Sequence, residues 1–303
     1  HDVIANVTYD KAKNYAFRVN PATGEKRSSS VERETVRTYV QDKIHLTDKW
    51  DLTPSLRYSH YSDYKESTGG NSAGNTNDFN YSLNTEYMFN DKVGMYLGWT
   101  KVFRPLRQGD YTTTDYVFNA PLKDEEGNVY TFGIHYDISD RTTVALHYDW
   151  TKMKNAIATL PVLDPNSGDF LSTPINAKED KQSINLTLDH QLNKHVTLSA
   201  SYSHMKDKWK SKDGWTLGPE SGWDSDDINT GINHLRPQNH YALNVSYENA
   251  RFYTGLLLNY YTGCSGLAFT DNRFLILDWN ANYEFANGIT CLLYTSPSPR
   301  DRT

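Results

Sequence analysis

The sequence predicts an all-β fold, a transmembrane antiparallel β-barrel of which this chain carries part, about 12–13 strands. Three observations predict it: apolar and polar residues alternate over strand-length segments, short turns alternate with long loops, and the composition suits a barrel without a dry core. Hydrophobic residues are 37% of the 303 residues, yet the chain holds 22 tyrosines and 7 tryptophans. In a membrane barrel only alternate residues meet lipid, so few aliphatic residues suffice. No apolar run of about 18 or more residues occurs, which excludes a transmembrane helix.

The clearest alternation forms a hairpin in the second half of the chain. Every second residue is apolar from Ile184 to Leu188, and again from Val196 to Tyr202. The residues between these segments include Asn193 and Lys194, which are typical of a tight turn. The pattern therefore predicts two antiparallel strands with one apolar and one polar face.

The same alternation recurs along the chain and places the other strands. They are expected at 1–9, 34–46, 49–63, 79–89, 93–99, 130–136, 144–150, 243–247, 252–260 and 275–285. Long polar loops are expected between them at 10–33, 65–77, 104–128, 154–180 and 206–237. The first residues already resemble the middle of a strand, so the chain is expected to be a fragment whose targeting signal lies upstream.

The connections between the strands are unequal in length. Short turns are expected near residues 48, 91, 140, 193, 249 and 287, with the long loops at the other strand ends. This asymmetry is typical of outer-membrane barrels. Aromatic residues beside the short turns would form an interfacial girdle: Trp50, Phe89, Tyr136, Tyr247, Phe252 and Phe285. A soluble β-sandwich or propeller is the alternative, because its strands alternate in the same way.

The alternation also predicts which side chains face lipid. The convex side should carry Ile184, Leu186, Leu188, Val196, Leu198, Leu256, Leu258, Leu275 and Leu277. The concave side should be lined by their polar neighbours, among them Asn185, Thr187, Ser199, Asn280 and Asn282.

Two short motifs flank the expected loop at 104–128. One strand ends in Phe103-Arg104-Pro105, and Asn119-Ala120-Pro121-Leu122 precedes a Glu-Gly step and the strand at 130–136. Each motif departs by one residue from its commonest form. In their order and spacing they resemble those of TonB-dependent outer-membrane receptors, and the resemblance covers residues 1–290. The residues matched to the family motifs are Phe103, Arg104, Pro105, Asn119, Pro121 and Leu122.

The resemblance implies a barrel of about 22 strands, closed by an N-terminal plug and surrounded by the lipid of the cell outer membrane. It implies active import of a scarce ligand, with a ferric siderophore as the leading candidate and TonB supplying energy through the plug region. Neither the plug nor a TonB box is seen in this chain. A haem, cobalamin or glycan receptor of the same fold is the alternative, and a passive porin or adhesin barrel is the rival from another class.

Aromatic side chains in two expected loops are the candidate ligand-binding residues. Large exposed aromatic side chains are costly in water and are common anchors for a ligand, although they could instead pack loop against loop. The candidates are Tyr111, Tyr116, Phe118, Trp209, Trp215 and Trp223.

No catalytic residue, cofactor or metal site is predicted. Acidic residues such as Asp124 and Asp226 fall in loops where they are solvated, and no nucleophile elbow, phosphate loop or zinc motif occurs. Haem receptors of the family carry a histidine in the loop between the two motifs, and residues 107–118 contain none. A net charge of −6 without a basic patch argues against a nucleic-acid partner.

Residues 291–303 are expected to be a non-native tail. The segment from Cys291 to Ser296 resembles the translated read-through of a transposase sequencing adapter and should break the strand begun at Gly288. Cys264, in an expected external loop, should then form no disulfide with Cys291.

Overall fold

The computed structural model describes residues 1–19, 23–66, 74–106, 122–163, 170–211, 237–264 and 271–295, which form one antiparallel sheet of 14 strands. Each strand pairs with the next in the chain, except that the two-residue β4 pairs with β2 and β3 pairs directly with β5. This order confirms the predicted all-β antiparallel fold. The strands are β1 (Asp2–Val19), β2 (Lys26–Thr47), β3 (Trp50–Tyr61), β4 (Lys65–Glu66), β5 (Thr76–Asn90), β6 (Val93–Arg104), β7 (Glu125–Ser139), β8 (Thr142–Leu163), β9 (Phe170–Gln191), β10 (Val196–Ser211), β11 (Asn239–Glu248), β12 (Phe252–Thr262), β13 (Arg273–Glu284) and β14 (Thr290–Tyr294).

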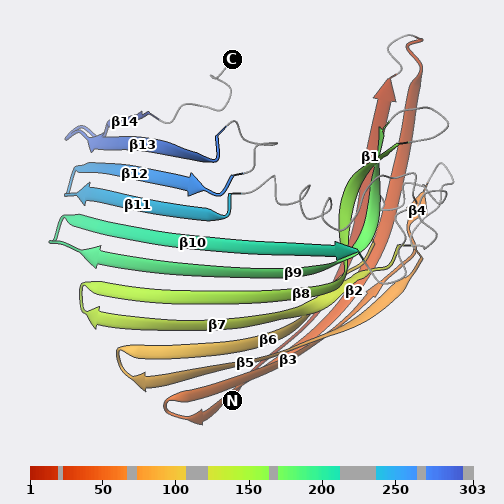
Figure 1. The fold of residues 1–303 in the computed structure, drawn as a ribbon, viewed down its shortest axis with the longest axis horizontal. Helices are drawn as coiled ribbons and strands as arrows, with labels where there is room; N and C mark the ends of the chain where they lie inside the picture. The colour runs from red at the N-terminus through yellow and green to blue at the C-terminus, as the bar shows by residue number, and fades with distance from the viewer. Residues whose placement is uncertain are drawn as a thin grey trace.

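All six short turns lie at one end of the strands, on the left in Figure 1. They occupy 48–49, 91–92, 140–141, 192–195, 249–251 and 285–289, which confirms the six predicted positions. Asparagine side chains fix several of them: Asn90 Oδ1 accepts hydrogen bonds from the backbone N–H of Lys92 at 2.8 Å and of Val93 at 3.0 Å. The long connections all lie at the opposite end of the strands.

Several strands continue far into segments predicted to be loops. β1 runs to Val19 and β2 begins at Lys26, so most of the expected loop at 10–33 is a hairpin. The expected loop at 154–180 is likewise mostly strand, because β8 ends at Leu163 and β9 begins at Phe170. Alternation ended these strands too early because the period of two is lost there: Lys26–Arg33 is almost entirely polar, whereas Ala156, Ile157 and Ala158 are apolar at consecutive positions.

Residues opposite one another in the register form apolar rows across the sheet. One row crosses eight strands through Val93, Tyr136, Val144, Leu188, Ala200, Leu243, Leu258 and Leu277. The register puts all nine residues predicted to face lipid on this one side of the sheet. No second layer covers the rows within the described part of the chain, and Leu275 and Leu277 are 56% and 53% exposed. The soluble sandwich is therefore wrong for these residues.

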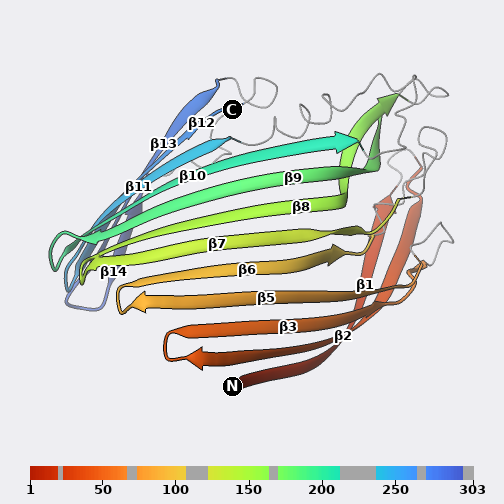
Figure 2. The same ribbon diagram turned by 60° about the horizontal axis from the view of Figure 1, so that its bottom comes forward.

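The sheet is one curved wall that runs from β1 to β14 (Figure 2). Within the described residues β1 pairs only with β2 and β14 only with β13, so the wall is open. None of the described segments contains a helix long and apolar enough to cross a membrane.

The last strand corrects one expectation about the tail. Thr290–Tyr294 pairs with Asn280–Glu284 of β13, so the strand does not break at Cys291 but continues to Tyr294. The backbone ladder accepts these residues because an edge strand needs only one partner. The non-native origin of 291–303 stays a prediction. Cys264 is buried and Cys291 is exposed, and both are free thiols.

Candidate functional site on the inner wall

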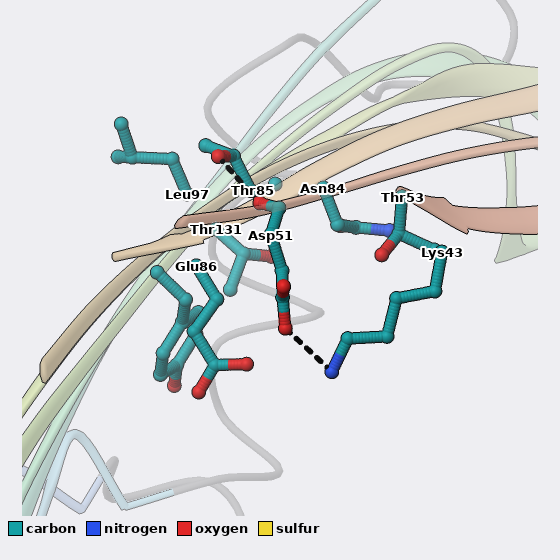
Figure 3. Close-up of a pocket in the computed structure, with 10 residues that line it drawn as sticks. Lys43, Asp51, Thr53, Asn84, Thr85, Glu86, Leu97 and Thr131 are labelled. Atoms are coloured by element: carbon teal, nitrogen blue, oxygen red, sulfur yellow. Dashed lines mark hydrogen bonds and ion pairs between the residues drawn. The ribbon is translucent and has the colours of Figure 1, made fainter. Parts of the chain in front are cut away.

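The polar face of the sheet, called here the inner wall, is a continuous surface of hydrogen-bonding side chains. One of its rows passes through Glu86, Tyr96, Gly133, His147, Asn185, Ser203 and His240. In Figure 3 the side chains of Lys43, Asp51 and Glu86 lie on the inner side of the curved sheet, whereas Leu97 lies on the other side. The inner wall is therefore the surface that a solute inside the barrel would meet.

A groove of about 250 Å³ lies on the inner wall near the short turns (Figure 3). Two of its charges are paired, since Lys43 Nζ lies 2.7 Å from Asp51, and the carboxylate of Glu86 also lines the groove. Beside the groove, His45 lies between two carboxylates: its Nδ1 is 2.7 Å from Asp51 Oδ1, and its Nε2 is 3.0 Å from Asp2 Oδ2. The groove is lined by Lys43, Asp51, Thr53, Asn84, Thr85, Glu86, Tyr96, Leu97, Gly98 and Thr131. Since Lys43 and Asp51 neutralise each other and Glu86 adds a negative charge, this groove does not favour an anionic ligand.

A hydrogen-bonded chain crosses three strands next to the groove. Tyr96 Oη bonds to His147 Nδ1, and His147 Nε2 lies 2.6 Å from Asp149 Oδ2. Thr131 donates to the other oxygen of Asp149 at 3.1 Å. Gly133 makes the chain possible, since a Cβ there would lie 2.0 Å from Cζ of the Tyr96 ring.

The connection between β6 and β7 is anchored at its first end to β2. Arg33 of β2 donates from Nη1 to the Leu106 carbonyl at 2.9 Å and from Nε to the Ser62 carbonyl at 3.0 Å. Its guanidinium also lies over the rings of Tyr61 and Tyr64, with centroids at 5.1 and 4.5 Å. Arg33 is only 8% exposed, so these contacts are shielded from water.

Asp124 joins the two ends of the same connection. Its Oδ1 accepts a hydrogen bond from the Leu106 backbone N–H at 2.8 Å, and its Oδ2 accepts one from Thr76 of β5 at 2.8 Å. The carboxylate of Asp124, expected to be a solvated loop acid, is therefore a structural acceptor.

The second end of the connection is anchored to β8 and β9. Asn176 accepts from the Lys123 N–H at 2.7 Å and donates to the Lys123 and Asn155 carbonyls, each at 2.9 Å. It is almost fully buried. Residues from β2, β5, β8 and β9 thus hold both ends of the connection in fixed positions.

The described family-motif residues belong to this anchor. Phe103 and Arg104 end β6, and Pro105 and Leu122 lie in the anchored ends. Arg104 forms an ion pair with Glu125. The Phe103 ring lies 6.2 Å from that of Tyr61, centroid to centroid. Asn119 and Pro121 lie outside the described residues.

The structure describes one of the six candidate ligand-binding aromatics, Trp209. Tyr111, Tyr116, Phe118, Trp215 and Trp223 lie outside the described residues. Trp209, expected in a loop, lies instead in β10 opposite Glu179 and is only 8% exposed. The strand extends because the ladder between β9 and β10 continues past the apolar alternation.

The anchor of the connection was not predicted from the sequence. Arg33 and Asn176 both fall in segments expected to be loops, where a polar residue carries no signal of burial. The available signal was the pair of motifs at 103–105 and 119–122, which marked the same connection.

Comparison with known proteins identifies the family. The model of the TonB dependent receptor-like β-barrel matches residues 1–294. An uncharacterized TonB-dependent receptor of Haemophilus influenzae is 24% identical over 181 residues, which are 58% of this chain and 49% of that protein. The chain thus spans about half the length of the curated relative that it matches.

Solved structures show the same fold. The siderophore receptor PiuA from Acinetobacter baumannii has a TM-score of 0.63 at 14% identity, covering 93% of this chain and 46% of that chain. The pyoverdine outer membrane receptor FpvA from Pseudomonas aeruginosa PAO1, bound to pyoverdine, has a TM-score of 0.65 at 15% identity, covering 89% and 38%. The chain therefore belongs to the TonB-dependent receptors, which are transport receptors of the outer membrane rather than enzymes, and it forms part of the β-barrel.

Proposed function

We propose that the complete receptor containing this chain imports a ferric siderophore across the outer membrane with energy supplied through TonB. The observation that carries this proposal is the anchored connection between β6 and β7. Leu106 and Asp124, one at each end of the connection, are held by hydrogen bonds from Arg33 and Thr76. A connection fixed at both ends can present side chains to a ligand at lower entropic cost than a freely moving loop.

The chemistry of the expected loops supports a ligand of this kind. The anchored connection contains Tyr111, Tyr116 and Phe118, and the connection after β10 contains Trp215 and Trp223. Aromatic rings stack on flat groups such as catecholates, and each such contact contributes about 0.5–1.5 kcal/mol. Two of the structural neighbours are named as receptors for a siderophore or for pyoverdine. In this proposal the protein is a transporter without enzymatic activity, and its partners are the ligand, the lipid and TonB.

The test is uptake of radiolabelled ferric siderophores by cells that carry the complete receptor as their only iron receptor. We expect saturable uptake that is lost when TonB is deleted or the proton gradient is collapsed. A passive porin would keep the same uptake without TonB. Saturable TonB-dependent uptake of haem, cobalamin or a glycan, with none of any ferric siderophore, would replace the proposed ligand by that alternative.

A further inference from the structure

A second pocket on the inner wall lies further from the short turns than the groove beside Lys43 and Asp51. It crosses β2, β3, β5 and β6 and has a volume of about 340 Å³. Its polar and charged lining consists of Tyr39, Ser55, Arg57, Asn80, Tyr81, Ser82, Thr100 and Lys101. Unlike the groove beside Lys43 and Asp51, it contains polar groups without partners.

Asn80 is the first of these groups. Its side chain is 6% exposed, and neither its Nδ2 nor its Oδ1 has a hydrogen-bond partner. Buried side-chain amides in folded proteins are nearly always hydrogen-bonded, because desolvation without a partner is unfavourable. A buried amide with both ends unpaired at a pocket therefore indicates a ligand that can both accept and donate a hydrogen bond.

Arg57 is the second group. It lies directly opposite Asn80 in the register, and its Nε is buried without a hydrogen-bond partner. Two cations on the neighbouring strands are neutralised: Lys101 of β6 lies 2.8 Å from Asp78, and Arg37 of β2 lies 3.1 Å from Asp10. Among the described residues, no carboxylate lies within ion-pair distance of Arg57.

We propose that Arg57 and Asn80 bind a hydroxycarboxylate group of the transported solute. A guanidinium presents parallel N–H donors that match the two oxygens of a carboxylate. Asn80 Nδ2 adds a third donor for the same oxygens, and Asn80 Oδ1 accepts the hydrogen of a neighbouring hydroxyl group. The negative charge of Asp78 does not oppose the ligand, since Lys101 neutralises it. That the solute is transported rests on the proposed function, whereas binding of a hydroxycarboxylate by Arg57 and Asn80 does not.

The test measures binding of citrate to the complete purified receptor by isothermal titration calorimetry. Tricarballylate, which has the same carboxylates without the hydroxyl group, and inorganic phosphate are the comparison probes. We expect citrate to bind best, with an affinity at least about tenfold lower in Arg57→Gln and in Asn80→Leu, which corresponds to one charge-assisted hydrogen bond. Asn80→Asp should weaken binding at least as much, because its carboxylate would pair with Arg57 and repel the ligand.

Arg37→Gln is the matched control, because it removes a cation of the same region that already has the partner Asp10. Its citrate affinity should equal that of the wild type. Heat-modifiable electrophoretic mobility verifies that each variant barrel has folded, and Asn80→Asp keeps the shape of the side chain if Asn80→Leu does not fold.

Three outcomes would overturn the proposal: no citrate binding by the wild type, equal affinity in Arg57→Gln, or tighter binding of phosphate than of citrate. Binding by purified protein needs no TonB, so a failure here is distinct from a failure of TonB-dependent uptake.

Discussion

At Arg33 a single buried guanidinium connects β2 to backbone carbonyls after β3 and β6. Hydrogen bonds to charged donors contribute about 1.5–3 kcal/mol each, and removing the donor leaves the carbonyls unpaired. Arg33→Gln should therefore loosen residues 105–106 and 122–124. The amide hydrogen exchange of Leu106 and of residues 122–124 should become at least about tenfold faster, by the relation between free energy and opening equilibrium.

The control for this change is Arg37→Gln, on the same strand. The ion pair between Arg37 and Asp10 is half exposed, and such pairs contribute about 0.2–1 kcal/mol. It should leave the exchange of the anchored segments unchanged. Equal exchange rates in Arg33→Gln and the wild type would show that Asp124 and Asn176 hold the connection without Arg33.

A second prediction concerns Gly133, which leaves room for the Tyr96 ring. A methyl group at Gly133 would lie 2.0 Å from Tyr96 Cζ, so the ring must leave its place beside His147. Overpacking of this kind costs about 1–3 kcal/mol. Gly133→Ala should lower the urea midpoint of barrel unfolding, whereas Gly74→Ala, whose nearest contact would be 3.7 Å away, should not. An unchanged midpoint in Gly133→Ala would mean that the ring moves without loss of stability.

At the scale of elements, the sequence predicted the hairpins well and the strand ends poorly. The six short turns and the apolar rows follow from turn residues and from a period of two, which are local signals. The parts of β1, β2, β8 and β9 that lie far from the short turns do not alternate between apolar and polar residues, so only their pairing reveals them. Burial of Arg33 and of Asn176 depends on contacts with Leu106 and Lys123, which are distant in the sequence, and no local pattern contains such contacts.

The connections at the far end of the strands carry a prediction about ligand affinity. If they form the ligand site, replacing both Trp215 and Trp223 by alanine should weaken ligand binding about tenfold or more, since each aromatic contact contributes about 0.5–1.5 kcal/mol. Folding should be unaffected, because loop tips contribute little to the ladder. The measurement is equilibrium binding to the complete receptor with and without the double substitution. Unchanged affinity in a folded double mutant would remove this connection from the site.

At the scale of the whole molecule, the two faces of the wall face different surroundings. The apolar rows meet lipid, and the inner wall carries the groove beside Lys43 and Asp51 and the pocket of Arg57 and Asn80. This division explains why the described chain buries few apolar side chains yet holds buried polar ones such as Ser59, Asp78 and Asn80. A membrane barrel is stabilised by lipid on its outer face, so the interior can be given over to polar contacts.

Neighbouring residues on opposite faces test this division directly. Leu188 lies in the apolar row between Val144 and Ala200, whereas Thr187 lies on the inner wall between Ala145 and Ser201. A lysine on the lipid face costs about 2–4 kcal/mol at the bilayer midplane and less toward the interface, while one on the inner face can remain hydrated. Leu188 lies three residues before the end of β9 at Gln191, so a cost of about 1–2 kcal/mol is expected there. Leu188→Lys should therefore lower the free energy of folding into lipid vesicles by about that amount, and Thr187→Lys should change it by less than about 1 kcal/mol. Both variants place the same lysine side chain at adjacent positions, so the added charge is equal and the face of the sheet differs. If the two destabilise equally, lipid does not contact the row through Leu188.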